Sequence, residues 1–201
     1  MRTEDHIKTF DKQVDVYVRM KNNDKFSKYR RKLFYKASGN VLEVGVGTGL
    51  NFPYYNEVEK LTAVDFSKPM IAEAKREAAK YPFPVEFIHG DAEAVEFEEN
   101  SFDTIVSSLS FCSYNNPVKL LNNFNLWCKE GGQILLLEHG LAKFKVIQML
   151  QRAVDPLTMR MIGCHQNRDI EKIAASSNLE ITEVERYVIG AFYLIQAKPL
   201  K

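Results

Sequence analysis

The sequence predicts an α/β protein whose mostly parallel sheet is covered by helices on both faces. Strand-like and helix-like segments alternate after residue 38, which is typical of parallel strands joined by crossover helices. The run 41–44 is apolar except for Glu43, as in a central strand that is buried on both faces. With 201 residues, 45% of them hydrophobic and 26% charged, the chain fits one globular domain with a real core.

The expected elements follow one another with few interruptions. The first five strands are expected at 41–44, 61–64, 85–89, 102–107 and 133–137. Helices are expected at 51–56, 67–80, 116–128 and 167–177, with a helical insert at 143–161. The last two strands, 180–187 and 191–198, resemble a closing hairpin.

Local signals set several of these boundaries. Ser67 is a suitable N-cap, and Pro69 fits the first turn of the helix that follows it. Asn116 and Pro117 have the order of an N-cap and a first helical residue. The glycine pair 131–132 is expected to turn the chain into the fifth strand.

A glycine-rich turn follows the first strand. Gly45, Gly47 and Gly49 have the spacing G-x-G-x-G, and a backbone without Cβ atoms can pass close to a ligand. The dinucleotide-binding pattern G-x-G-x-x-G fails, because its last glycine would fall on Leu50 or Phe52. A phosphate-binding P-loop fails as well, because no Gly-Lys-Ser/Thr follows. The turn therefore predicts a ligand site and argues against a nicotinamide-dependent oxidoreductase.

Acidic residues follow the second and third strands. Ligands of open α/β sheets bind beyond the carboxyl ends of the strands. Asp65 is therefore expected to accept hydrogen bonds from the ribose hydroxyls of a nucleoside, and Asp91 from an adenine amino group. The alternative roles are a helix cap or surface charge for Asp65 and a turn residue for Asp91. Residues 107–111, after the fourth strand, would lie under the ligand.

Positive charge is concentrated at the N-terminus. Residues 1–36 hold eleven Lys or Arg and five acids, whereas the whole chain has a net charge of only +1. Such a segment could contact an anionic membrane surface or nucleic acid. The alternative is a solvated amphipathic helix that packs on the domain through Phe26, Tyr29, Leu33 and Phe34.

The cysteines and the apolar runs suggest an intracellular protein. Cys112, Cys128 and Cys164 are odd in number and form no Cys-x-x-Cys pair, so we expect neither a zinc site nor a disulfide framework. Cys112 and Cys164 are expected to be buried, inert thiols. No apolar run is long enough for a transmembrane helix, and the polar start lacks the features of a signal peptide. A cytoplasmic location follows as the expectation.

Five motifs in this order resemble the class I S-adenosylmethionine-dependent methyltransferases. They lie at 43–49, 65–70, 90–93, 100–103 and 129–132. The resemblance covers residues 10–198 and implies a doubly wound, Rossmann-like sheet of seven strands in the order 3-2-1-4-5-7-6, with an antiparallel C-terminal hairpin. It implies S-adenosylmethionine as the cofactor, S-adenosylhomocysteine as the product, and no metal. The residues expected to bind the cofactor are Glu43, Gly45, Gly47, Gly49, Asp65, Phe66, Met70, Asp91, Ala92, Ser108 and Phe111.

Within this superfamily the chain most resembles two groups. One comprises the bacterial phosphatidylethanolamine and ubiquinone/menaquinone-type methyltransferases, and the other the animal methyltransferase-like thiol methylators. The likeness rests on the glycine turn and on the segments 137–139, 163–169 and 185–195. In this family an N-terminal aromatic residue closes over the cofactor. Phe10 stands at the usual tyrosine position, so Tyr17 is the candidate lid residue.

Methyl transfer from a sulfonium is an in-line displacement, for which the protein supplies binding, orientation and exclusion of water. The expected acceptor is a small molecule or a lipid, such as a phospholipid amine, a quinol or a thiol. His139 and Tyr17 are the candidate catalytic residues, and a structural hydrogen bond is the alternative role of His139. Further candidates are Glu138, His165 and Tyr114. The alternative function is a non-catalytic scaffold or sensor that binds S-adenosylmethionine or S-adenosylhomocysteine.

These features divide the single expected domain 1–201 into four parts. They are a basic helical lid at 1–37, a cofactor-binding core at 38–140, a helical insert or substrate cap at 141–165, and a C-terminal helix and hairpin at 166–201. Met149, Met159 and Met161 are expected in the core rather than in a substrate pocket. If the lid and the insert are both basic and amphipathic, we expect the protein to contact a membrane peripherally and to methylate a lipid or a quinone. Nucleic acid is not an expected partner, and the sequence does not indicate the oligomeric state.

Overall fold

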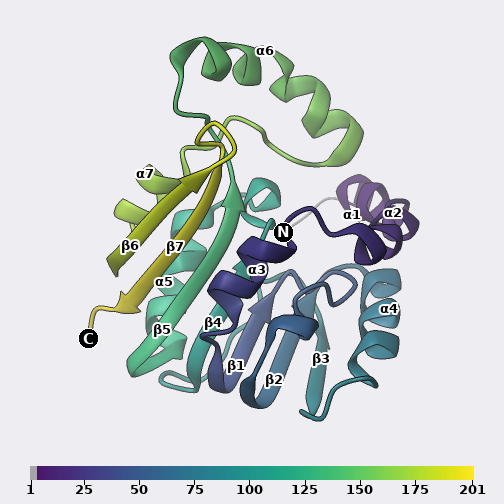
Figure 1. The fold of residues 1–201 in the computed structure, drawn as a ribbon, viewed down its shortest axis with the longest axis vertical. Helices are drawn as coiled ribbons and strands as arrows, with labels where there is room; N and C mark the ends of the chain where they lie inside the picture. Colours follow the sequence, from purple (N-terminus) through teal and green to yellow (C-terminus); the bar gives the residue numbers. More distant parts are fainter. Residues whose placement is uncertain (1–3) are drawn as a thin grey trace.

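The computed structural model describes residues 4–201 and contains one seven-stranded sheet (Figure 1). Its strand order is β3-β2-β1-β4-β5-β7-β6, so the predicted fold class and topology are confirmed. β7 is antiparallel to both β5 and β6, and the other neighbouring pairs are parallel. The strands are β1 (Ser38–Val44), β2 (Glu57–Asp65), β3 (Val85–His89), β4 (Phe102–Ser108), β5 (Cys128–His139), β6 (Leu179–Tyr187) and β7 (Phe192–Pro199).

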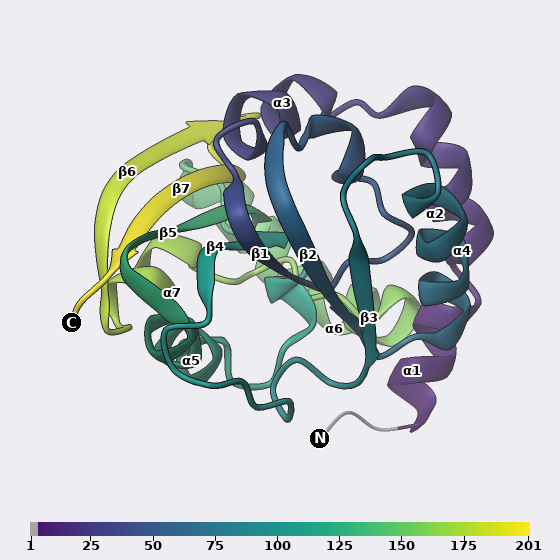
Figure 2. The same cartoon turned by 90° about the horizontal axis from the view of Figure 1, so that it is seen from below.

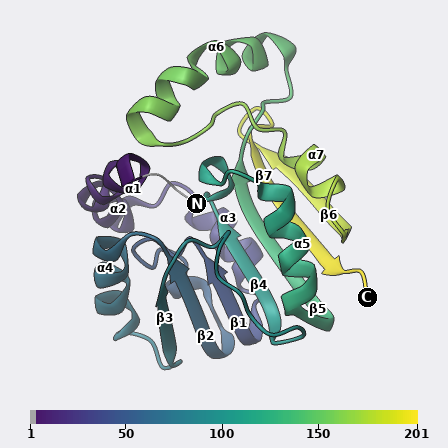
Figure 3. The same cartoon turned by 180° about the vertical axis from the view of Figure 1, so that it is seen from behind.

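Helices cover both faces of the sheet (Figures 2 and 3). One core cluster joins the sheet to α3 and α4, and the other joins it to α5 and α7. Ser67 caps α4 through the Met70 amide, and Asn116 caps α5, as the sequence predicts. The helices are α1 (Glu4–Asp11), α2 (Val14–Met20), α3 (Ser27–Phe34), α4 (Lys68–Ala78), α5 (Pro117–Trp127), α6 (Lys145–Ile162) and α7 (Ile170–Ala175).

Several expected boundaries are wrong. The helix expected at 51–56 is only a 3₁₀ turn, η2 (Phe52–Tyr54), because the flanking Asn51 and Tyr55 turn their side chains inward to the buried Glu43. The expected turn at 131–132 lies inside β5, where the partner of Phe102 is Cys128 but the partner of Thr104 is Gln133. The extra residues form a wide irregularity in the strand.

The N-terminal segment is three short α-helices rather than one. Only α3 is tied into the core, through Tyr29, Leu33 and Phe34, whereas α1 and α2 contain no buried residue. Residues 1–3 of the predicted lid 1–37 lie outside the described residues. η1 (Lys21–Asn23) joins α2 to the loop that leads into α3.

Helix α6 projects beyond the carboxyl ends of the strands, on the same side of the molecule as α1 and α2 (Figures 1 and 3). It leaves the end of β5 and returns to α7 through residues 163–169. Within residues 4–201, no helix is long and apolar enough to cross a membrane.

Candidate active site

A cavity of about 410 Å³ opens at the carboxyl ends of β1, β2, β4 and β5. Residues of α1 and α2 line it on one side, and the end of α6 and the segment after it line another. Of the catalytic and cofactor-binding candidates predicted from sequence, those that line it are Tyr17, Gly45, Gly47, Asp65, Phe66, Met70, Ser108, Tyr114 and His139.

The glycine turn forms the wall of the cavity above β1. The amides of Gly45 and Val46 both donate to the carbonyl of Val64, at 2.9 and 3.1 Å, so the turn is bound to the neighbouring strand β2. A Cβ placed on Gly47 would meet no atom within 4 Å. Gly49 instead packs on the ring of Phe52, where a Cβ would come within 2.7 Å. The turn therefore presents bare backbone to the cavity at Gly47 and is held from below at Gly49.

Asp65 lies at the end of β2 and connects the glycine turn to the start of α4. One carboxylate oxygen accepts from the Gly47 amide at 2.8 Å, and the other accepts from the Ser67 amide at 2.9 Å. The side chain that caps α4 is Ser67, not Asp65. The buried carboxylate is thus fixed at the edge of the cavity beside the glycine turn.

Arg30 of α3 is the main site residue that the sequence reasoning missed. Its side chain is only 3% exposed, and its Nε lies 3.0 Å from Asp24. Its guanidinium donates to Ser108 Oγ at 2.6 Å and also to Asn51 Oδ1. Arg30 therefore joins α3, the glycine loop and the end of β4, and it lines the cavity. Arg30 belongs to the apolar face 26, 29, 30, 33 and 34, a spacing that could have separated it from the other basic residues.

Glu43 lies beneath the glycine turn. It is 1% exposed and accepts hydrogen bonds from Asn51 Nδ2 and Tyr55 OH, each at 2.7 Å. Burial raises the pKa of Glu43 to about 7, and the two hydrogen bonds oppose this rise. In this position Glu43 supports the loop, and its direct contact with a cofactor stays a prediction.

Comparison with known proteins identifies the family. A family model described as a methyltransferase domain matches residues 42–136. The phosphatidylethanolamine N-methyltransferase of Cereibacter sphaeroides is 30% identical over 147 residues, which cover 72% of this chain and 72% of that protein. The chain belongs to the class I S-adenosylmethionine-dependent methyltransferases.

Other relatives of this methyltransferase differ from it in length or in sequence. The mitochondrial methyltransferase OMS1 of Saccharomyces cerevisiae is 32% identical over 92% of this chain, which spans only 44% of the yeast protein. Geranyl diphosphate C-methyltransferase of Streptomyces coelicolor, solved with S-adenosylhomocysteine, has a TM-score of 0.67 at 13% identity, over 87% of this chain and 77% of that one. The cofactor of this methyltransferase is S-adenosylmethionine, and the fold predicted for the protein is confirmed.

The cavity fits this cofactor on the side of β1 and β2. Gly47 offers a backbone that no side chain covers, Asp65 offers a carboxylate, and Phe66 and Met70 offer apolar surface. When bound, S-adenosylmethionine supplies an electrophilic methyl group on a sulfonium. These residues would bind and orient it and would exclude water from the methyl group.

Like Glu43 and Gly49, the predicted cofactor residues Asp91, Ala92 and Phe111 do not line the cavity. Asp91 accepts from the Glu93 amide at 3.1 Å, and its carbonyl accepts from two amides of the same turn. Ala92 and Phe111 belong to the core cluster on the face of α5. The adenine contact of Asp91 therefore stays a prediction, and in this structure Asp91 organises the turn after β3.

The two candidate catalytic residues line the cavity from different elements. Tyr17 comes from α2, and burial, with the negative charge of Asp65 as a smaller cause, raises its pKa. His139 ends β5, and burial, with the charge of Arg168 as a smaller cause, lowers its pKa to about 4. His139 is therefore neutral at pH 7 and can accept a proton. Phe10 also lines the cavity and packs edge-on against Phe66, with ring centroids 5.2 Å apart.

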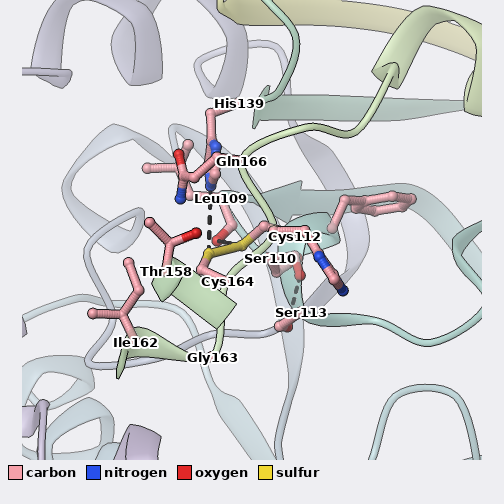
Figure 4. The surroundings of a disulfide bond; sticks show 12 residues. Leu109, Ser110, Cys112, Ser113, His139, Thr158, Ile162, Gly163, Cys164 and Gln166 are labelled. Atoms are coloured by element: carbon pink, nitrogen blue, oxygen red, sulfur yellow. Dashed lines mark hydrogen bonds between the residues drawn. A yellow bond between two sulfur atoms is a disulfide. The ribbon is translucent and has the colours of Figure 1, made fainter. Parts of the chain in front are cut away.

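The expectation of two separate thiols is wrong. Cys112 and Cys164 form a disulfide across 52 residues of sequence, and Cys128 is the free, buried cysteine. The bond joins η3 (Phe111–Ser113), which follows β4, to the residues after α6. His139 Nε2 lies 3.5 Å from Cys164 Sγ, as Figure 4 shows. Sequence spacing could not reveal this pairing, because only the fold brings the two loops together over the end of β5.

The remaining candidates have structural partners. Glu138 is fully buried and accepts from the hydroxyl of Ser107 and from the amides of Ser110 and Phe111, so it fixes the loop after β4. Tyr114 lines the cavity, and the His165 ring bonds to Asp155 at 2.9 Å. Met149 and Met161 are 67% and 65% exposed, so the expectation that they belong to the core is wrong.

Proposed function

We propose that this methyltransferase acts on an amphiphilic acceptor, a lipid amine or a quinol, which is held at an anionic membrane surface while α6 lies on that surface. The observation that carries the proposal is the orientation of α6. Gln148, Gln151 and Asp155 face the protein, whereas most of the large apolar side chains of α6 are exposed, the reverse of a helix that covers a core.

The inward side of α6 is held by hydrogen bonds. Gln148 donates to the carbonyl of Ala142, and Gln151 donates to the carbonyls of Gly140 and Gln166 and accepts from the Ala142 amide, all within 3.1 Å. Asp155 is the helix's buried residue, and it accepts from the Gln166 amide at 2.6 Å. These contacts leave the opposite side of the helix uncovered.

The outward side of α6 and its N-cap carry large apolar side chains. Val146, at 71%, is the most exposed of them. An uncovered apolar face of this length is the property that places amphipathic helices in the lipid interface. Its members are Phe144, Val146, Met149, Leu150, Val154, Leu157 and Met161.

Charge supports an anionic surface as the occupant. Lys145, Arg152 and Arg160 lie on α6, Lys143 precedes it, and its acid, Asp155, points inward. Each basic residue near an anionic leaflet contributes about 1 kcal/mol to association. Ile162 belongs to this helix and also lines the cavity, so an acceptor in the surface would lie near the cavity.

The chemistry then needs few protein groups. When bound, S-adenosylmethionine would supply the methyl group, and the cavity would orient the nitrogen, oxygen or carbon atom of the acceptor toward it. An ammonium or a quinol would first lose a proton. Neutral His139 lines the cavity and can hold this proton only transiently, because burial lowers its pKa to about 4 and so opposes its protonation. Tyr17 and the neighbouring α1 and α2 would close the cavity against water.

Vesicle flotation tests the proposal. We expect the protein to float with vesicles of phosphatidylcholine that contain phosphatidylglycerol, and to float less with phosphatidylcholine alone. The double variant Leu150→Asp and Leu157→Asp should reduce flotation at least about tenfold, because each buried leucine contributes roughly 1.5–3 kcal/mol. Val184→Asp, at a half-exposed site on β6, is the matched control and should float like the wild type.

Methyl transfer gives the second measurement. Labelled methyl groups from S-adenosylmethionine should appear in lipid amines or quinols presented in these vesicles, and the double variant should transfer fewer of them. Affinity for S-adenosylhomocysteine should be unchanged in both variants, which shows that they fold. Equal flotation by the double variant and the wild type would contradict the proposal.

A further inference from the structure

We propose that Cys112, His139 and Cys164, once the disulfide is reduced, form a Zn²⁺ site with one coordination position open to the cavity. One ligand atom from each of the three residues lies within 4.8 Å of the others. The residues come from three elements, η3, the end of β5 and the turn after α6, so the fold itself brings them together. The metal site does not depend on the proposed acceptor. It would occupy His139, so the proton-accepting role proposed for His139 belongs to the protein without bound metal.

The spacing fits tetrahedral zinc. With Zn–S bonds of about 2.3 Å and Zn–N bonds of about 2.0–2.1 Å, ligand atoms stand roughly 3.5–3.8 Å apart. His139 Nε2 already lies 3.5 Å from Cys164 Sγ. The two sulfur atoms would separate to this spacing when the bond between them breaks, which needs only side-chain rotation at Cys112 or Cys164.

The two cysteine segments are held together without the disulfide. The His165 amide donates to the carbonyl of Cys112 at 3.0 Å, and this bond joins the same two loops through their backbones. The ring of His165 and the amide of Gln166 both bond to Asp155 of α6. These contacts would keep Cys164 beside Cys112 after reduction.

The position of the third ligand, His139, is fixed relative to Cys112 by the neighbouring Glu138. Glu138 precedes His139 on β5, and its carboxylate accepts from the amides of Ser110 and Phe111 at 3.0 and 3.1 Å. Those residues lead directly into Cys112. Such support around the ligands is what orients a metal site before the metal binds.

The donor set selects the metal and leaves room for another ligand. Two thiolates and one imidazole favour zinc over Mg²⁺ or Ca²⁺, which prefer oxygen, and two thiolates balance the charge of Zn²⁺. Three protein ligands with a fourth position for water or substrate are typical of reactive zinc sites. His139 and Cys164 both line the cavity, so the fourth position would face it and accept a sulfur or oxygen anion.

The metal site can form only after a dithiol has reduced the disulfide. Two electrons and two protons pass from the dithiol to the disulfide, which gives Cys112 and Cys164 as thiols and the dithiol as its own disulfide. Zn²⁺ then binds both sulfurs and releases the two thiol protons. The oxidised protein, with its sulfurs bonded to each other, lacks two of the three ligands.

Cobalt titration tests the site, because Co²⁺ replaces Zn²⁺ and absorbs light. The protein is reduced with dithiothreitol, freed of it under nitrogen and titrated with Co²⁺. We expect one Co²⁺ per chain, with the thiolate-to-cobalt charge-transfer bands and the visible bands of a tetrahedral centre, and we expect Zn²⁺ to displace it. A small monothiol should shift these bands by occupying the open position. The oxidised protein should give no such bands.

Variants separate the site from nonspecific binding. Cys112→Ser, Cys164→Ser and His139→Ala should each weaken Co²⁺ binding by more than about 100-fold, beyond the effect of losing an outer-shell partner. Cys128→Ser, at the free and buried cysteine near the start of β5, should bind Co²⁺ like the wild type. S-adenosylhomocysteine binding is measured on every variant as the test of folding.

Two results would overturn the metal site. One is a reduced protein that binds S-adenosylhomocysteine but gives no thiolate-to-cobalt bands. The other is a Cys164→Ser variant with wild-type affinity for Co²⁺. Neither measurement contains a membrane or an acceptor, so failure of the metal site is distinguishable from failure of vesicle binding or lipid methylation.

Discussion

The cofactor side and the acceptor side of the cavity are attached to the protein in different ways. On the cofactor side, the glycine turn is bonded to β2 through Gly45 and through Asp65, within a few residues of the buried strands. On the side that we propose for the acceptor, α1, α2 and α6 contribute no described residue to either core cluster. Contacts outside the core hold them instead. These include the hydrogen bonds of Gln151, the bond from His6 to the carbonyl of Gly163, and the packing of Phe10 on Phe66.

This difference explains how one fold serves different acceptors. The stability of the sheet depends on the apolar surface that β1, β2, β4 and β5 bury, and the cofactor residues lie at the ends of those strands. A change in α6 alters the entrance and the exposed surface without removing core contacts. We therefore expect changes on the cofactor side to lower stability or cofactor affinity, and changes on α6 to affect the acceptor alone.

The largest expected effect concerns Arg30. Through this residue α3 belongs to the cofactor side of the cavity, whereas α1 and α2 belong to the opposite side. Arg30→Leu should lower the free energy of unfolding by about 3–5 kcal/mol, because it leaves Asp24 as a buried carboxylate without its cation. It should also weaken cofactor binding, since Asn51 and Ser108 lose their shared donor. Denaturant unfolding and calorimetry measure the two effects.

The neighbouring arginine is the control for this change. Arg31 is exposed and lies over the ring of Tyr54 at 5.8 Å, so Arg31→Leu should change stability by no more than about 0.5 kcal/mol. A loss below about 1 kcal/mol in Arg30→Leu would mean that α3 is not tied to the cofactor side in the way its contacts indicate.

Gly47→Val is expected to have the next largest effect, on binding rather than on folding. Gly47 has φ +54°, and an added Cβ would stand in open space in front of the turn, with no protein atom within 4 Å. The variant should therefore fold but bind S-adenosylhomocysteine about 100-fold more weakly, because the cofactor is displaced from its position. Its flotation with anionic vesicles should be unchanged, since α6 is not affected.

Gly131→Val is the control that distinguishes the effect of backbone strain from the effect of blocking the cavity. Gly131 has φ +76° and also meets nothing within 4 Å of an added Cβ, but it lies in the irregular part of β5 away from the cavity. Gly131→Val should share the strain and keep the affinity for S-adenosylhomocysteine. Equal affinity in the two variants would show that the backbone at Gly47 does not approach the cofactor.

The sequence predicts the cofactor side of the cavity well and the acceptor side poorly. The strands, the glycine turn and Asp65 are recognisable because each depends on residues that are close together in the chain. Strand topology then places Asp65 beside Gly47. The family resemblance identified the cofactor through the same local motifs.

The acceptor side depends on contacts between distant segments. The Cys112–Cys164 pair spans 52 residues, and no short pattern marks it. The exposure of α6 is not predictable from the sequence, because apolar residues at helical spacing look the same whether their face is buried or exposed. Met149 and Met161 are therefore exposed against the expectation that methionines belong to the core. Only the positions of Gln151 and Asp155, on the opposite side of the helix, show which face points inward.

The smallest expected effect is a pH dependence that differs between the two sides. Burial raises the pKa of Glu43 from 4.5 to about 7, so its protonated form stabilises the fold fully below pH 4.5, and this contribution is lost as the pH rises through 7. His139, on the acceptor side, acts in the opposite direction. Its pKa is lowered from 6.5 to about 4, so neutral His139 is compatible with the fold above pH 6.5 and its protonation destabilises the fold as the pH falls towards 4.

Because these two trends oppose each other in the wild type, the difference between variant and wild type is the quantity to measure. Glu43→Gln keeps an acceptor for the Asn51 amide and cannot ionise, so its stability relative to the wild type should rise by about 2 kcal/mol between pH 5 and pH 7. Urea unfolding at several pH values measures this difference, and Glu57→Gln, at the exposed start of β2, should follow the wild-type profile. A Glu43→Gln difference that does not change with pH would mean that Glu43 is already ionised in the folded protein. The carboxylate would then be available to the loop and the cofactor as a charge, and the cofactor side would depend on electrostatics rather than on a neutral hydrogen-bonded acid.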